Sequence, residues 1–338
     1  MSEYAAAYGR MRALKGKLLS REEFDTLLKA PVLNEAVAFV RTHTGVEISD
    51  TTSLSQIEHK LKESLLVDYL KIIKFLDGGP AEVVKCLISR FELINLKAIF
   101  HSKMAGVKLS EEFIFDLGPH CTINLENLLR AQNLEECFGI CEITMYKTTA
   151  ALLSRSFKDG KPYPLCLTLD LDYYQRLHNS LSRLSYFDKQ NAEIFLGTQI
   201  DVLNILRFLR LKFNYSFSPG EIFHYILPYG LKFTKALFWK IAEAEDPISL
   251  FKLKPYNQIL TALQGANVVL DAEIALNRYL FNFAKRKIIG TSPFQITPLL
   301  AFFMLKEFEI RDIISILNGK KLGLEPAEIK KHLITWIN

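Results

Sequence analysis

Three short sets of polar residues recur with one spacing inside apolar stretches of the chain. Each set holds an acid, an amide or second acid three residues later, and a lysine eleven residues after the acid. The sets are Glu92, Asn95 and Lys103; Asp201, Asn204 and Lys212; and Glu309, Asp312 and Lys320. Side chains of these types can form hydrogen bonds and ion pairs with one another, or line a polar channel.

The spacing has a meaning on an α-helix, where positions i, i+3 and i+11 fall within about 80° of one another. Each set is therefore expected to form one narrow polar stripe. The other faces are almost wholly apolar, as in 202–209, so these helices need burial on several sides. The acids lie 109 and 108 residues apart (92 to 201, 201 to 309), about a third of the 338 residues. We predict three central helices in three similar units.

The polar stripe admits two interpretations. In the first, it forms hydrogen bonds and ion pairs between neighbouring helices, because buried charges require partners. In the second, it lines a central hole where the three units meet. The sequence leaves both interpretations open.

Other candidates for chemistry are few. Asp170 and Asp172 form an acid pair that a metal-dependent hydrolase would use, but acids at the start of a helix also explain it. Phosphate-binding and zinc-hydrolase motifs are missing and the 7 His are scattered, so we expect no catalytic residue, no cofactor and no metal site. Cys137 and Cys141 lie four apart, which indicates buried free thiols and a reducing compartment.

Composition favours an all-α fold with a large core. The chain is 49% hydrophobic, with 24 Phe and 13 Tyr against 16 Gly and 12 Pro. Its formal net charge of +5 is mild, and no nucleic-acid-binding module is visible. The longest apolar run, 296–305, is shorter than the roughly 20 residues of a membrane span, and no leader peptide is expected at the start.

Residues that commonly cap helices predict several helix starts. Ser20 and Ser218 each precede a glutamate by three residues, as in a capping box. A helix is also expected to begin at Ser110, whereas 165–169 is either a short strand or a linker. The predicted units are residues 1–110, 111–219 and 220–338.

Several stretches carry a resemblance to a known family. The opening Tyr4–Ser20 (YAAAYGRMRALKGKLLS), the segment Ser89–Lys97 (SRFELINLK), the pair Asp201 and Asn204, and Leu165–Tyr174 (LCLTLDLDYY) occur in order along nearly the whole chain. Together they resemble the C subunit of the archaeal and bacterial V-type (A-type) ATP synthases, the counterpart of the d subunit of the vacuolar ATPase. The third set departs from the family pattern, with Asp312 where Asn is usual, so an identical polar contact is not expected in all three units.

The resemblance implies a non-catalytic part of a rotary motor. The family fold is three similar helical units arranged with pseudo-threefold symmetry as a funnel. It implies a peripheral position on the cytoplasmic face of the membrane, where the funnel links the central shaft, made of the D and F subunits, to the proteolipid ring. The funnel thereby couples ATP hydrolysis or synthesis to proton or sodium transport, without nucleic acid.

Two alternatives follow from the residues alone. A free-standing helical-repeat adaptor would have unrelated partners and would never copurify with a proteolipid ring. A hydrolase built on Asp170 and Asp172 would bind divalent ions tightly and lose activity on Asp172→Asn.

Overall fold

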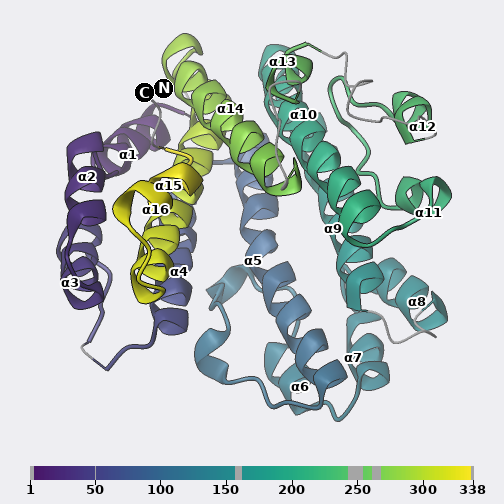
Figure 1. Ribbon diagram of the computed structural model, residues 1–338. Helices are drawn as coiled ribbons and strands as arrows, with labels where there is room; N and C mark the ends of the chain where they lie inside the picture. The colour runs from purple at the N-terminus through teal and green to yellow at the C-terminus, as the bar shows by residue number, and fades with distance from the viewer. Residues whose placement is uncertain (1–3, 50, 157–161, 243–253, 261–267, 336–338) are drawn as a thin grey trace. The chain divides into compact units, whose positions relative to one another are not determined.

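The computed structural model describes residues 4–49, 51–156, 162–242, 254–260 and 268–335. In these ranges every regular element is helical and no strand occurs, so the predicted all-α class is confirmed (Figure 1). The chain forms two compact units: a larger unit of Met1–Leu76 and Ser185–Asn338, and a smaller unit of Asp77–Leu184. The predicted division into three units of sequence is a different partition and stays a prediction.

The smaller unit is organised around one long helix, α5 (Gly78–Ala105), which packs along α9 (Pro162–Ser180). Between them come α6 (Leu125–Arg130), α7 (Leu134–Cys141), α8 (Lys147–Ser156) and the 3-10 turns η1 (Glu111–Phe113) and η2 (Gly118–His120). A further 3-10 turn, η3 (Leu181–Arg183), follows α9. Phe100 of α5 meets Phe138 of α7 edge to face, with ring centroids 5.5 Å apart.

The larger unit contains two long buried helices, α10 (Tyr186–Leu209) and α15 (Thr297–Lys321). Its other elements are α1 (Ala5–Lys15), α2 (Arg21–Lys29), α3 (Leu33–Thr44), α4 (Leu54–Ile73), the π-helical turn η4 (Arg210–Asn214), α11 (Pro219–His224), α12 (Lys235–Ala242), α13 (Tyr256–Leu260), α14 (Val268–Gly290) and α16 (Pro326–His332). Helix α10 packs on α14, and α15 packs on both α14 and α4. Elements from the two ends of the chain therefore share one core.

The local signals located most helix starts correctly. Ser20 and Ser218 each form the predicted capping box, with side chains that accept from the backbone of Glu23 and Glu221. The third central helix is buried almost all round, from Thr297 to Gly319, as the apolar pattern of α15 predicted.

Two local predictions were wrong. Residues 165–169 are neither strand nor linker but lie inside α9, which begins at Pro162, where a missing N–H leaves no helical bond unmade. Leu165, Leu167 and Leu169 are buried in the smaller unit, so packing overrode their alternating pattern. After Ser110 the chain makes only the 3-10 turn η1, because its hydroxyl does not cap the backbone. The sequence also predicts loops at 158–164 and 246–247. Residues 162–164 instead begin α9, and 158–161 and 246–247 lie outside the described residues.

One close approach in the smaller unit gives a testable prediction. A Cβ on Gly79 would lie 2.2 Å from the carbonyl oxygen of Arg183, which is backbone and cannot swing away. Gly79→Ala is therefore expected to lower the free energy of unfolding by about 1–3 kcal/mol, measured by denaturant titration. Gly9 lies in α1 with nothing within 4 Å of its own Cβ position, so Gly9→Ala is the matched control and is expected to be neutral or slightly stabilising. Equal effects of the two substitutions would contradict this packing.

Candidate functional site: backbone clamps on the long helices

The first two positions of each predicted polar set lie on a long helix, α5, α10 or α15. Lys103 and Lys320 lie on the same helices as their acids, whereas Lys212 follows α10, in the π-helical turn η4. The acids and amides at the first two positions are buried: Glu92, Asn95, Asp201, Asn204 and Asp312 are 0% exposed and Glu309 is 3% exposed. Such groups cost several kcal/mol to bury without partners, so their hydrogen bonds decide what they do. Each long helix uses its set to hold the backbone of another segment, an arrangement that we call a backbone clamp.

The acid of each clamp on α5 and α10 accepts hydrogen bonds from two consecutive backbone N–H groups. Glu92 accepts from Thr122 at 2.6 Å and from Ile123 at 3.0 Å. A tyrosine hydroxyl completes its shell, since Tyr146 donates to Glu92 Oε2 at 3.0 Å. The carboxylate therefore fixes a loop that is 30 residues further along the chain.

The clamp on α10 repeats this pattern. Asp201 accepts from the backbone of Lys232 at 2.9 Å and of Phe233 at 2.8 Å. The Tyr256 hydroxyl donates to Asp201 Oδ2 at 3.0 Å. The same chemistry thus recurs with an aspartate in place of a glutamate.

The second position of each clamp holds another loop. Asn95 bonds both backbone groups of Phe115, accepting from its N–H at 2.9 Å and donating to its carbonyl at 2.8 Å. Asn204 does the same with Leu227, at 2.8 and 2.9 Å. An amide suits this task because it carries both a donor and an acceptor.

Asp312 stands at this position on α15 and behaves differently because a carboxylate has no donor. It accepts from the backbone N–H of Ile334 at 2.9 Å and of Thr335 at 2.6 Å, and also from the Thr335 hydroxyl. Asn95 and Asn204 each donate to a backbone carbonyl, whereas Asp312 accepts from a second backbone N–H instead. The contact of the third set therefore differs from the other two.

The lysine of each clamp caps the end of a short helix. Lys103 donates to the carbonyl of Leu129 at 2.7 Å, near the end of α6. Lys212 reaches Ala242 at the end of α12, at 3.3 Å. A cation at these carbonyls also complements the negative end of the helix dipole.

The third clamp is completed by the opposite end of the chain. Glu309 accepts from the backbone N–H of Leu19 at 2.5 Å, and Lys320 donates to the carbonyls of Leu28, at 2.7 Å, and Ala30. These contacts bracket α2 as the contacts of the other two clamps bracket α6 and α12. Residues near the start of the chain therefore supply the part that should follow the third central helix.

Sequence reasoning missed the backbone partners of the clamps, and a signal for them existed. Each acid binds backbone just before a helix that opens with a capping side chain: Asn124 for α6, Thr234 for α12 and Ser20 for α2. A search for a capping residue after each central helix finds Asn124 and Thr234. It misses Ser20, because that residue lies near the start of the chain and not after α15.

Burial sets the protonation chemistry of the clamps. Desolvation raises the pKa of the Asp201 and Asp312 carboxyls above the ordinary value of 3.8, and their hydrogen bonds oppose the shift. Burial likewise lowers the pKa of the Lys320 ammonium. Each acid accepts hydrogen bonds from backbone N–H groups of its own chain.

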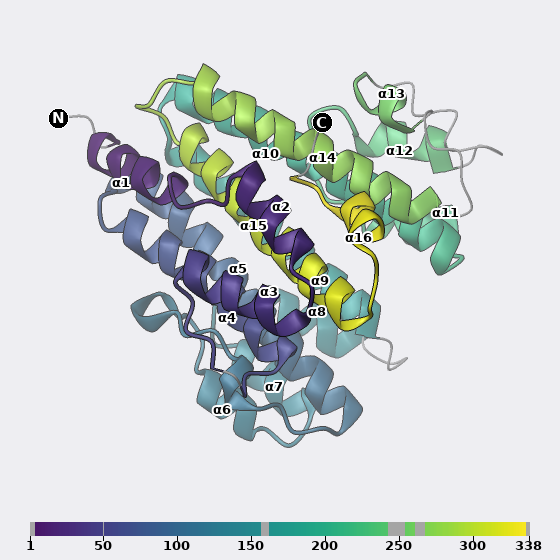
Figure 2. The same cartoon turned by 60° about the vertical axis from the view of Figure 1, so that its left-hand side comes forward.

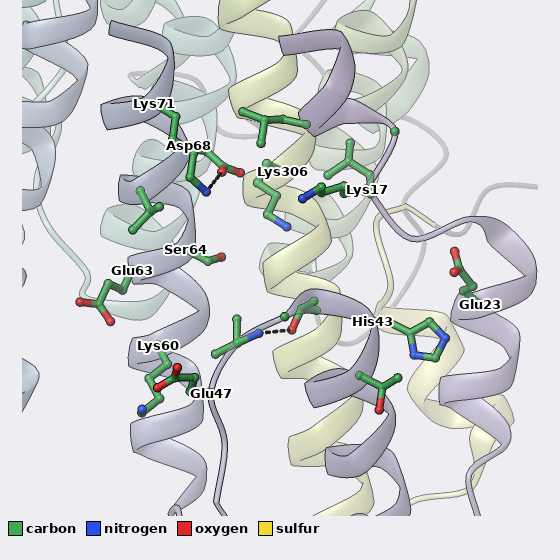
Figure 3. Close-up of a pocket in the computed structure, with 18 residues that line it drawn as sticks. Lys17, Glu23, His43, Glu47, Lys60, Glu63, Ser64, Asp68, Lys71 and Lys306 are labelled. Carbon is green, nitrogen blue, oxygen red and sulfur yellow. Dashed lines mark hydrogen bonds and ion pairs between the residues drawn. The ribbon is translucent and has the colours of Figure 1, made fainter. Parts of the chain in front are cut away.

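A cavity of about 680 Å³ lies in the larger unit, beside the third clamp. Its walls come from α4, α15, the loop after α1 and the residues after α3 (Figure 3). Lysines and acids both line it, among them Lys306, whose ammonium donates to Glu309 Oε2 at 2.6 Å.

Each acid of the pair considered for a metal site is bound to a cation, and the pair lies inside α9 and not at the start of a helix, so the helix-start explanation was wrong. Asp170 pairs with Lys97 at 2.5 Å, and Asp172 pairs with Arg176 at 2.9 Å. Across the described ranges, no group of three or more His, Cys, Asp or Glu could hold a metal ion. Cys137 and Cys141 are buried free thiols as predicted, and burial raises the pKa of Cys137 to about 11.

In the described ranges the chain is an all-helical protein whose buried polar groups bind its own backbone. A sequence model of the ATP synthase (C/AC39) subunit family matches residues 7–332, and the chain belongs to that family. The chain is 22% identical to the C subunit of the A-type ATP synthase of Methanosarcina mazei, over 98% of this chain and 93% of the relative. It is 25% identical to that of Methanosphaera stadtmanae (98% and 88%) and 23% identical to that of Halobacterium salinarum (98% and 98%). In the part of the chain that the structure describes, no helix is long and apolar enough to cross a bilayer.

The clamp on α10 gives a prediction with a pH dependence. Asn204→Asp removes the donor to the Leu227 carbonyl and buries a carboxyl group. It is expected to lower the free energy of unfolding by about 2–4 kcal/mol at pH 8. Burial raises the pKa of the neighbouring Asp201, so the new carboxyl is also expected to have a raised pKa when folded. Its protonated form is then favoured by folding, and the loss should be smaller at pH 5 and grow as the pH rises.

The control is Asn34→Asp, at an exposed site in the first turn of α3, where a negative charge is expected to be harmless. Urea unfolding at both pH values measures both variants. A loss for Asn204→Asp that is no larger than for Asn34→Asp would contradict the role of Asn204.

Proposed function

We propose that this protein is a non-catalytic central-stalk component of a rotary V-type ATPase or ATP synthase. In this role it is a socket that joins the central shaft, made of the D and F subunits, to the membrane proteolipid ring. It thereby couples ATP hydrolysis or synthesis to proton or sodium transport. The observation that carries the proposal is the family match over 7–332, together with relatives that are named as the C subunit of A-type ATP synthases.

The repeated clamps support a pseudo-threefold funnel. Each long helix holds one loop through its acid, one segment through its amide or second acid, and one short helix through its lysine. Three copies of one such module, of which the last is closed by the start of the chain, are what a ring-like arrangement about an axis requires. We propose that the polar sets are structural and do not line the central hole, because their side chains already form hydrogen bonds with backbone groups of the chain.

A socket that transmits torque must resist deformation. Close-packed helices are stiff, and loops that are bonded to buried carboxylates cannot shift by one residue without orphaning those charges. This mechanical role needs no catalytic group, in agreement with acids and lysines that bind the chain's own backbone.

One end of the larger unit has the surface that a membrane-side partner would need. Tyr186 and Phe187 at the start of α10 are 68% and 71% exposed, and Phe294 before α15 is 55% exposed. The backbone N–H of Ile296 donates to Asp188 at 2.8 Å, which brings these segments together; both are at the left of Figure 2. Large exposed aromatic side chains are typical of docking surfaces, and we propose that this end meets the proteolipid ring on its cytoplasmic face.

Copurification of the tagged protein with motor subunits from membranes tests this function. The protein is expected to bring down the D and F subunits and the proteolipid, and a double variant Phe187→Ser, Phe294→Ser is expected to retain D and F but lose the proteolipid by about tenfold or more. The control is Leu322→Ser, at a 73% exposed leucine that follows the opposite end of α15. A protein that remains in the soluble fraction without any of these subunits would instead support a free-standing adaptor.

A further inference from the structure

The cavity beside the third clamp is lined by a buried cation that has no counterpart in the other two clamps. Lys306 lies three residues before Glu309 and is 9% exposed. The residues three before the other two acids are Ser89 and Thr198, whose hydroxyls bond carbonyls of their own helices at 2.7 Å. Two of the three clamps therefore have a small hydroxyl side chain three residues before the acid, where the third clamp has a lysine.

The acids of those two clamps are completed by the hydroxyls of Tyr146 and Tyr256. Within the described residues no tyrosine hydroxyl bonds Glu309, and the Lys306 ammonium takes that place at 2.6 Å. The third clamp thus differs from the others in two linked ways: a charged donor replaces a neutral one, and a cavity of about 680 Å³ adjoins it.

A second ammonium reaches the same part of the cavity. Lys17, in the loop between α1 and α2, points toward Lys306 in the space between α4 and α15 (Figure 3). Among the residues that the structure describes, none forms a hydrogen bond or an ion pair with the Lys17 side chain. Glu309 compensates the charge of the Lys306 ammonium, so the charge of Lys17 is the one that an anion in the cavity would balance.

The end of the cavity near Lys17 and Lys306, which we call the inner end, has a net positive charge despite the acids that line the cavity. Asp68 is paired with Lys71 at 3.4 Å, and Glu23 is held in the capping box of α2, where it accepts from the Ser20 N–H at 2.7 Å. Glu47 lies beside Lys60 at the far end in Figure 3, and Glu63 points away from the two converging lysines. At the inner end Lys17, Lys71 and Lys306 therefore face Asp68 and Glu309, which leaves one unbalanced positive charge.

We propose that this cavity binds the phosphate group of a small ligand, held between Lys17 and Lys306. Lysine ammonium groups bind phosphate as compact point charges, and the volume lies within the range of small-ligand sites. The bound group would tie the loop that carries Leu19 to α15 and α4. This site is separate from the proposed coupling role and does not rest on it.

The test uses the full chain and inorganic pyrophosphate, with sodium chloride added to controls to match ionic strength. Pyrophosphate is expected to bind in isothermal titration calorimetry and to raise the melting temperature of the wild type. Lys17→Gln and Lys306→Thr are each expected to weaken binding by about tenfold. Lys306→Thr also removes a donor to the buried Glu309, so its fold must be checked, whereas Lys17 is exposed and its loss should not disturb the core. Circular dichroism checks both.

The control variant is Lys74→Gln, at an exposed lysine just after α4 that does not line the cavity. Vesicles of phosphatidylglycerol, with phosphatidylcholine as the neutral reference, form a second arm. Lys17-dependent binding of pyrophosphate alone identifies a free phosphate compound, and Lys17-dependent binding of the anionic vesicles identifies a lipid headgroup. The proposal is overturned if pyrophosphate does not bind beyond the salt control, or if Lys17→Gln and Lys306→Thr bind like Lys74→Gln.

Discussion

The architecture depends on buried carboxylates that accept hydrogen bonds from backbone N–H groups of distant segments. A carboxylate that leaves water without such partners costs several kcal/mol, whereas the same group with two N–H donors is well satisfied. Glu92 and Asp201 each take two consecutive N–H groups and a tyrosine hydroxyl. The bond therefore fixes the register of the loop as well as its position, because a shift by one residue would leave a buried charge without donors.

The same interaction ties together the two ends of the sequence. Glu309 and Lys320 of α15 hold the backbone of Leu19, Leu28 and Ala30, and the hydroxyl of Tyr4 bonds Asp188 at the start of α10. Helix α4 packs on α15, so the first residues are part of the last module and not an appendage. The smaller unit, Asp77–Leu184, is by contrast one continuous stretch with a complete clamp of its own. A closed ring of modules is one way to use such an arrangement, and it is the one we propose.

The periodicity of the sequence predicted the long helices and the polar positions on them. Spacing alone located the first two positions of each polar set on a long helix, and capping residues located the starts of α2 and α11. Backbone N–H groups carry no residue-type signal of their own, so the partner of Glu92 could be found only indirectly, from the capping residue Asn124 that follows it. Nothing in the sequence indicated that Leu19 binds Glu309, because 290 residues separate them. The alternating leucines of 165–169 misled for a related reason, because packing against tertiary neighbours decides between helix and strand in short apolar runs.

These clamps are consistent with the mechanical task that we propose for this member of the ATP synthase (C/AC39) subunit family. Hydrogen exchange measured residue by residue by NMR tests the central claim most directly, since Leu19 lies in a loop and would otherwise exchange rapidly. The account predicts that the Leu19 amide exchanges at least about a hundredfold more slowly than that of Glu47, an exposed residue whose N–H forms no hydrogen bond in the described ranges, and that Glu309→Ala abolishes the difference. Equal exchange of the two amides in the wild type would contradict it.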